Sequence, residues 1–298
     1  MSTVAVCGLV NMETTASVEN FPIEYRPVDY RFFGVSSYPA GVGFNVASAL
    51  NTLGDEVRLL SVTGKDTAAD VIKKELESKG ISTEFILPIS KGTAQSVVLY
   101  DQSGRRYVIS DLTDNQEISY DEEFFVHGVK DADIICMCNI NYSAKMLGLA
   151  KETGALIATD VHCLSDIYDE YNSRFMKAAD ILFLSNEAIK GREEEFSLKL
   201  MEEYSNSVIV VGMGDKGALL RTKDSADVRL IPAVTTRKVI NTVGAGDSLF
   251  SAFIHFYAKS RDAEDSLRKA TYFASWKIGE KGAAKGFLSE EELLKLMK

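Results

Sequence analysis

The sequence predicts one α/β domain, in which a mostly parallel sheet carries helices on both faces and a small β appendage leaves the main sheet. Short, continuously apolar runs alternate with stretches of helical periodicity, which is typical of parallel strands buried on both faces. Residues 12–38 and 91–112 interrupt this alternation with strand and turn signals. The 298 residues, 46% of them hydrophobic, are enough for one large core, and no repeat or linker divides them.

The first part of the chain alternates strands with helices. Residues 3–10 and 56–64 are short apolar runs rich in β-forming side chains. Between them, residues 45–54 predict a helix that ends at a glycine. After the second run, residues 66–80 predict another helix, with Asp66 as its N-cap and a glycine at its end.

Four further apolar runs predict buried strands, and helical stretches separate several of them: residues 131–140, 154–162, 178–186 and 206–214. Residues 212–217, GMGDKG, match the GxGxxG pattern of dinucleotide-binding proteins. The strand-like sequence ALLRT follows instead of a helix, so these glycines are interpreted as a strand–turn–strand. Within residues 91–112, a hairpin is predicted around Gln102–Gly104.

Composition and charge exclude several functional classes. The formal net charge of −10 argues against nucleic acid or an anionic membrane as a partner. No run reaches the roughly 18 apolar residues of a spanning helix, and the first residues lack a basic signal region. The four cysteines include no CxxC pair, which favours free thiols in a reducing cytoplasm. Three histidines lack ligand spacing and are interpreted as packing or surface residues: His127, His162 and His255.

The strongest chemical signal is the stretch VINTVGAGDSLFSAFIHFY, residues 239–257. Gly244 and Gly246 let backbone N–H groups approach an anion, and a helix predicted from about Ser248 points its positive end at the same place. Asp247, directly beside this cradle, suits a base that takes a proton from a hydroxyl group while the amides hold a phosphoryl group. The alternative is structural: Asp247 caps the helix and the glycines only form the turn.

The same stretch resembles the C-terminal signature DTxGAGD of the ribokinase-like (PfkB) carbohydrate kinases, and residues 40–54, AGVGFNVASALNTLG, resemble the glycine-rich signature of that family. The resemblance covers nearly the whole chain. It implies a three-layer αβα sandwich with a mostly parallel central sheet and a small β-sheet lid, here residues 12–38 and 91–112. It also implies ATP-dependent phosphorylation of a hydroxymethyl group on a sugar or a nucleoside.

The resemblance implies a role for each position that matches the family's motifs. For the acceptor-binding pair Asn-x-acid after the first strand, the alternative is a polar loop without a ligand. Asp247 is implied to be the catalytic base, with an anion hole formed by Gly244, Ala245 and Gly246. The residues implied to bind the acceptor are Asn11 and Glu13, together with Gly41, Gly43 and Asn45 of a glycine-rich loop. The residues implied to bind the nucleotide are Gly214, Gly217 and Asn186.

Four positions depart from the family pattern. Ala40 and Gly212 replace a glycine and a threonine that the family prefers. Asn241 replaces the first Asp of DTxGAGD, which the family links to a monovalent cation. Because an amide oxygen binds such an ion more weakly than a carboxylate does, we expect the protein to depend little on potassium. In the Mg²⁺-linked NxxE motif, Ile189 replaces the Glu, so that either Glu187 holds the ion or Mg²⁺ arrives with the nucleotide.

These observations predict a sugar kinase that uses ATP and Mg²⁺, with a ribose-like pentose as the favoured acceptor. A nucleoside kinase, pseudouridine included, is one alternative, and a sugar- or nucleotide-binding protein without activity is another. The changed cation and NxxE positions favour the binding protein, whereas the intact Gly244–Asp247 opposes it. Two lids are expected to pair in a homodimer. Packing within the lid is the favoured explanation of its aromatic side chains: Phe21, Tyr25, Tyr30, Phe32 and Phe33.

Overall fold

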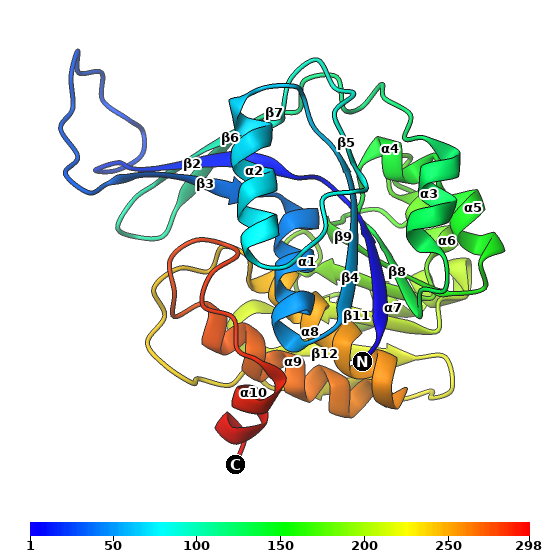
Figure 1. The fold of residues 1–298 in the computed structure, drawn as a ribbon. Helices are drawn as coiled ribbons and strands as arrows, with labels where there is room; N and C mark the ends of the chain where they lie inside the picture. The colour runs from blue at the N-terminus through cyan, green and yellow to red at the C-terminus, as the bar shows by residue number, and fades with distance from the viewer.

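The computed structural model describes residues 1–298 and contains one large and one small β-sheet (Figure 1). The strands of the large sheet are β1 (Thr3–Cys7), β4 (Glu56–Val62), β5 (Ile86–Leu87), β8 (Ile134–Met137), β9 (Leu156–Cys163), β10 (Ile181–Ser185), β11 (Val208–Gly212), β12 (Ala218–Thr222) and β13 (Arg229–Ile231). Their spatial order is β13-β12-β11-β10-β9-β8-β1-β4-β5. Neighbours from β11 to β5 in this order pair in parallel, and β12 and β13 extend the sheet by antiparallel pairing.

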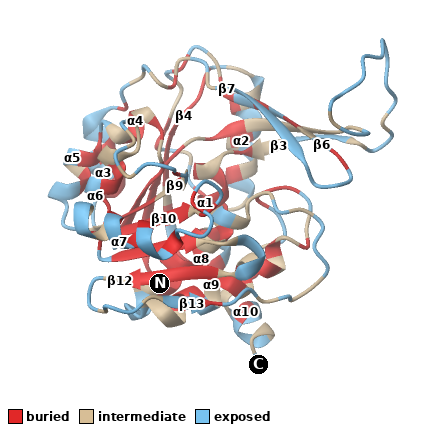
Figure 2. Ribbon diagram, turned by 180° about the vertical axis from the view of Figure 1, so that it is seen from behind, coloured by how far each residue is buried: buried red, intermediate tan, exposed pale blue.

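Side chains of the parallel strands alternate between two hydrophobic cores, one on each face of the sheet. On β1, Val4 and Val6 belong to one core, whereas Ala5 and Cys7 belong to the other. In Figure 2 the central strands are coloured almost entirely as buried. Burial on both faces is the reason that these strands show continuous apolar runs without polar alternation.

Helices cover both faces of the large sheet, and their apolar residues join the core of the face that they cover. One layer contains α1 (Val42–Leu53), α2 (Thr67–Ser78), α8 (Ala245–Ser260), α9 (Ala263–Lys277) and α10 (Glu290–Leu296). The other contains α3 (Glu122–Val129), α4 (Asn141–Ala144), α5 (Leu147–Glu152), α6 (Ser173–Ala178) and α7 (Glu193–Tyr204). The predicted three-layer sandwich is therefore confirmed. None of the helices combines the length and the apolar character needed to cross a bilayer.

Local signals located most elements but missed where the two glycine-rich helices begin. Helix α1 starts at Val42, three residues before the predicted start, and α8 starts at Ala245 instead of near Ser248. Glycine has low helix propensity and interrupts the apolar periodicity, so the first turn of each helix is hidden in the sequence. The alternative that Asp247 caps the helix is wrong, because Gly244 is the N-cap and Asp247 lies inside the first turn.

Other local predictions are confirmed by hydrogen bonds. The Asp66 carboxylate accepts a hydrogen bond from the N–H of Ala69 (2.9 Å), as expected of the N-cap of α2. The GMGDKG segment joins β11 to the antiparallel β12 through a short 3₁₀ turn at Gly214–Lys216, as predicted. The four cysteines are unpaired thiols.

The small sheet contains β2 (Asn11–Ser17), β3 (Val35–Ala40), β6 (Gln95–Tyr100) and β7 (Arg106–Asp111), in the order β3-β2-β6-β7. Strands β2 and β6 pair in parallel, and the outer pairs are antiparallel. The predicted hairpin joins β6 to β7, and its turn is closed by a hydrogen bond from the N–H of Gly104 to the carbonyl of Asp101 (3.1 Å). All strands of this sheet lie in residues 11–40 and 95–111.

Residues 18–34 form a long loop without strands, which projects from the end of the small sheet (Figure 1, dark blue). The prediction that the aromatic residues of the lid pack against other lid residues is wrong for Tyr25 and Phe33, whose side chains are exposed. Tyr30 and Phe32 stack on one another at 6.3 Å between ring centroids, yet both stay exposed, and Phe33 is fully exposed at 101%.

Candidate active site

The candidate site lies where the carboxyl ends of the parallel strands meet the small sheet. In the large sheet β1 lies between β4 and β8. After β1 the chain first adds β4 on one side of it and later adds β8 on the other side. Such a change of direction leaves a crevice at the carboxyl edge, where α/β proteins bind ligands. Strand β2 leaves this edge to begin the small sheet, and the first turns of α1 and α8 meet there.

A hydrogen bond between these two helices joins two of the predicted site residues. The Asn45 side-chain amide donates to Oδ2 of Asp247 at 2.7 Å. The contact requires α1 to start against the end of β1, and a Cβ on Gly43 would lie only 2.6 Å from the carbonyl oxygen of Gly8. Gly41, at φ 100°, forms the left-handed turn into the helix. The predicted substrate loop is therefore mostly the first turn of α1, since Gly43 and Asn45 are helical.

Asp247 lies among charged groups from several elements. Burial raises the pKa of its carboxyl group, and the neighbouring Asp160 raises this pKa further. His162, the Asn45 amide and Lys277 act in the opposite direction. Asp160 and His162 lie in β9, and the Asp160 carboxylate accepts a hydrogen bond from the N–H of His162 (2.8 Å). The interpretation of His162 as a packing or surface residue missed its proximity to Asp247.

The turn before α8 leaves backbone donors free. The N–H of Ala245 donates to the carbonyl of Thr242 (3.2 Å), whereas those of Gly244, Gly246 and Asp247 donate to no group of the chain. Gly244 has φ 76°, and a Cβ there would lie 2.8 Å from the Ala283 carbonyl oxygen. Three free N–H groups at the positive end of a 16-residue helix form a place for an anion.

Asn11 and Glu13 lie at the start of β2 and approach the same region from the small sheet. The Asn11 amide donates to Oγ of Ser96 (2.9 Å), while its Oδ1 is buried without a partner. Glu13 accepts a hydrogen bond from the Tyr38 hydroxyl (3.0 Å). Burial raises the pKa of Glu13, and so does the charge of Asp247, which places the two carboxylates in one site.

Arg106, at the start of β7, lowers the pKa of Glu13 by its positive charge. The sequence offered no sign of this electrostatic interaction, because it arises only when β7 pairs with β6 and β6 with β2, which puts both residues in one sheet.

The predicted nucleotide-side residues lie at the carboxyl ends of β10 and β11. Gly214 belongs to the 3₁₀ turn, and Gly217 ends it at φ 103°. A Cβ on Gly217 would lie 2.0 Å from the Ile231 carbonyl oxygen, so this glycine is required by the fold itself. Asn186 follows β10 and is buried.

The two predicted metal-linked residues, Glu187 and Asn241, lie after β10 and before α8 respectively. Glu187 is exposed, whereas Glu193 at the start of α7 accepts a hydrogen bond from the Asn186 amide (2.8 Å). Burial acts to raise the pKa of Glu193. The net pKa is nevertheless lowered, because Glu193 accepts hydrogen bonds from Asn186 and from backbone N–H groups and lies near the charge of Lys216. Oδ1 of Asn241 accepts a hydrogen bond from the N–H of Val243 (2.7 Å) within its own turn.

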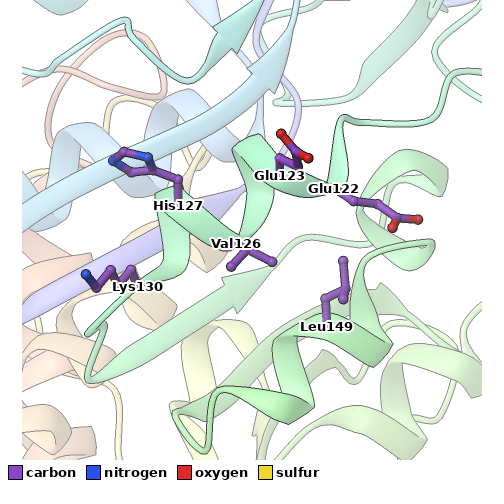
Figure 3. Close-up of a pocket in the computed structure, with 6 residues that line it drawn as sticks. All are labelled: Glu122, Glu123, Val126, His127, Lys130 and Leu149. Carbon is purple, nitrogen blue, oxygen red and sulfur yellow. The ribbon is translucent and has the colours of Figure 1, made fainter.

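A surface hollow elsewhere contains none of these groups. It is lined by one face of α3 and by Leu149 of α5, with His127 and Lys130 at one end (Figure 3). Its acidic side chains, Glu122 and Glu123, point outward in the first turn of α3. The convergent polar groups of the chain are therefore at the carboxyl edge of the large sheet and not in this hollow.

Comparison with protein-family models finds one match across almost the whole chain. Residues 1–290 match the model described as pfkB family carbohydrate kinase. Among characterised relatives, the chain is 26% identical to a deoxyribokinase of Salmonella typhi over 97% of this chain and 96% of that protein. It is 24% identical to an ATP-dependent ribose-1-phosphate kinase of Halopiger xanaduensis over 95% and 94% of the two chains.

Solved structures show the same fold. A microbiome-derived acarbose kinase superposes with a TM-score of 0.89 at 24% identity, covering 99% of this chain and 98% of that one. The ribokinase of Arabidopsis thaliana complexed with ribose and ATP superposes with a TM-score of 0.85 at 18% identity, covering 100% and 99%. These likenesses confirm the architecture of the large and small sheets.

We predict that Asn45→Ala raises the pKa of Asp247 further, because the lost hydrogen bond stabilised the ionised carboxylate. The variant should therefore bind the Asp247 proton at higher pH than the parent protein. Titration of the carboxyl carbon by NMR in aspartate-labelled protein measures this directly. Asn51→Ala is the control, since Asn51 lies on α1 but bonds the Lys79 carbonyl. An unchanged or lower pKa in Asn45→Ala would contradict the prediction.

Proposed function

Because the chain belongs to the pfkB family of carbohydrate kinases and is a sugar kinase, we propose that it transfers the γ-phosphoryl group of ATP to a hydroxymethyl group of a ribose-like pentose. The observation that carries this proposal is Asp247, a carboxylate of raised pKa beside three free backbone N–H groups at the start of α8. That combination suits a base next to an anion site. The sugar relatives named above support a pentose acceptor.

Asp247 acts on the acceptor in this proposal. Its carboxylate takes the proton of the acceptor hydroxyl while the hydroxyl oxygen forms a bond to the γ-phosphorus, and the bond from that phosphorus to the bridging oxygen of ADP breaks. A raised pKa makes the carboxylate a stronger base than an exposed aspartate. The N–H groups of Gly244, Gly246 and Asp247 stabilise the charge on the transferred phosphoryl oxygens. Asn45 orients the carboxylate through its 2.7 Å hydrogen bond.

Asn11 and Glu13 bind hydroxyl groups of the acceptor in this proposal. The free, buried Oδ1 of Asn11 can accept a hydrogen bond from one hydroxyl group. Glu13, held by the Tyr38 hydroxyl, can accept from a neighbouring one. Because these residues belong to β2 and the base belongs to α8, the small sheet acts as a lid that brings acceptor and base together.

A nucleoside acceptor is the second candidate, and the exposed aromatic residues of the loop 18–34 favour it. Tyr25, Phe32 and Phe33 offer ring faces that the fold leaves uncovered, and bases stack on such rings. One solved structure of similar fold is a nucleoside kinase of Burkholderia thailandensis in complex with inosine.

ATP lies at the ends of β10 and β11 in this proposal, near Asn186, Gly214 and Gly217. No cluster of three or more His, Cys, Asp or Glu side chains could hold a metal ion by itself. Mg²⁺ commonly takes one or two carboxylates, with phosphate oxygens and waters completing its shell. The ionised Glu193, which accepts a hydrogen bond from Asn186, would be the single carboxylate to hold a nucleotide-bound Mg²⁺, in place of the acid that is missing at Ile189. The ion would neutralise phosphate charge during transfer.

We also propose that two chains pair through their small sheets. Strand β7 is an open edge whose residues are all exposed, including Tyr107, Val108 and Ile109. Unprotected edges and apolar patches of this kind are usually covered by another surface. Light scattering is expected to give twice the chain mass of 32.8 kDa; the single-chain mass at micromolar concentration would refute the dimer.

We predict that Asp247→Asn lowers kcat by roughly 10²–10⁴-fold or more, with acceptor binding little changed, because the amide cannot accept the hydroxyl proton. ADP release is measured with Mg-ATP and a panel of pentoses, hexoses and nucleosides. Wild-type activity with a pentose supports the main proposal, and activity with nucleosides alone supports the alternative. Binding detected by thermal shift without any ADP release would favour a protein that binds without catalysis. A variant that keeps a third of the activity would exclude Asp247 as the base.

Removal of either acceptor-binding side chain should weaken the acceptor far more than ATP. A hydrogen bond to a charged group contributes about 1.5–3 kcal/mol and one between neutral groups about 0.5–1.5 kcal/mol, so acceptor KM should rise about tenfold or more in Glu13→Ala and roughly 2- to 10-fold in Asn11→Ala. Thr14→Ala is the matched control on the same strand, since its hydroxyl bonds that of Ser37 on exposed surface. If both site variants keep acceptor KM within twofold, these residues do not bind the acceptor.

A further inference from the structure

Lys277 is a fully buried lysine that the proposed mechanism does not use. It is the last residue of α9, and its side chain is 0% exposed. Its ammonium group donates one hydrogen bond, to the carbonyl of Val243 at 2.8 Å, and forms no ion pair with any carboxylate. A buried ammonium without a carboxylate partner is unfavourable, so its presence needs a reason beyond packing.

The peptide that Lys277 contacts is part of the anion-binding turn. The carbonyl of Val243 and the N–H of Gly244 belong to one trans peptide unit, in which these groups point in opposite directions. Lys277 binds the carbonyl side. The N–H on the other side is one of the three donors that have no partner in the chain. An ammonium at the carbonyl polarises this peptide and makes the N–H a stronger donor to an anion.

Asn241 gives a second, independent observation. The acid that the family links to a monovalent cation is absent at this position, and the Asn241 oxygen is occupied by the N–H of Val243 (2.7 Å). Two residues later, at Val243, the same turn is contacted by the ammonium of Lys277, a positive charge that belongs to the chain itself. The turn therefore contacts the ammonium of Lys277, and it has no carboxylate at position 241 that could bind a cation from solution.

We propose that the ammonium of Lys277 is the built-in cation of the phosphoryl-binding turn: it positions the Val243–Gly244 peptide, strengthens the Gly244 donor and makes a dissociable monovalent cation unnecessary. This inference rests on the proposed function for the identity of the anion. Lys277 is a positioning residue, since it acts on the phosphoryl group through the peptide.

The charges around Lys277 are consistent with an ammonium that is present at neutral pH. The pKa of Lys277 is lowered to about 8, mainly by burial. The charges of Asp247 and Glu280 act to raise this pKa, and the charge of Arg237 acts to lower it. The pKa lies below the ordinary value, so the charge is present below about pH 8 and is lost as the pH rises through that value. A fall in kcat on the alkaline side should therefore accompany deprotonation of Lys277.

Two variants separate the charge from the space that the side chain fills. Lys277→Gln keeps a donor for the Val243 carbonyl but removes the charge, and Lys277→Ala opens a cavity that a small cation can enter. Both should lower kcat by roughly 10–10²-fold while acceptor KM stays within about twofold. Arg268→Gln removes a charge from the exposed face of α9 and is the matched control, with unchanged kcat expected.

Potassium provides the decisive comparison. Wild-type kcat should be the same in potassium and in tetramethylammonium buffer, whereas potassium or methylammonium should restore part of the activity of Lys277→Ala. Potassium should also raise the Tm of Lys277→Ala relative to tetramethylammonium, without affecting the wild-type Tm. The inference is overturned if both variants keep the wild-type kcat, if potassium activates the wild type tenfold or more, or if potassium changes neither the kcat nor the Tm of Lys277→Ala.

Failure of the proposed function and failure of the Lys277 inference give different experimental results. A wild-type protein that releases no ADP with any acceptor of the panel refutes the proposed function, and the Tm measurement on Lys277→Ala then still tests the cation claim. An active wild type whose Lys277 variants are equally active refutes the inference and leaves the proposed function intact.

Discussion

The hydrogen bond between Asn45 and Asp247 is the contact on which the candidate site depends. It joins residues 202 positions apart and holds the first turns of α1 and α8 against each other. The contact exists only because Gly8 and Gly43 allow the start of α1 to approach the end of β1 closely. Any Cβ at Gly43 would displace α1, and with it the group that orients the Asp247 carboxylate. Packing of two glycines thus controls the geometry of a charged group on another helix.

Positive groups at the site offset its negative charge locally, although the chain as a whole is acidic. The protein carries a net charge of −10, and Glu13, Asp160 and Asp247 add acidic groups to the site itself. An anionic substrate therefore needs positive groups at short range. Backbone N–H groups of α8 supply part of this, and Lys277 supplies a full charge from within the core. Because the ammonium is reached only through the protein, solvent ions screen it less than they would a surface lysine.

The two sheets divide the proposed work between them. Strand β2 carries Asn11 and Glu13 directly out of the carboxyl edge of β1, so in the proposed function the small sheet presents groups to the acceptor without a separate domain. The proposed base and the proposed anion-binding turn are on α8, which packs on the large sheet. Closure of the small sheet would change the distance between acceptor and base. The aromatic loop 18–34 extends the small sheet into solvent, where a base or a second chain could contact it.

The sequence by itself determined the parallel strands β1, β4 and β8–β11, the cap at Asp66 and the family, because these depend on local patterns. A strand buried on both faces shows its apolar run wherever it occurs, and the glycine signature beside Asp247 is contiguous in the sequence. Only the tertiary structure decided which groups interact across the candidate site. Lys277 is 34 residues from the Val243 that it contacts, and Arg106 acts on Glu13 from another strand of the small sheet. Local sequence contains no record of such contacts, since they arise from the packing of helices and strands that are distant along the chain.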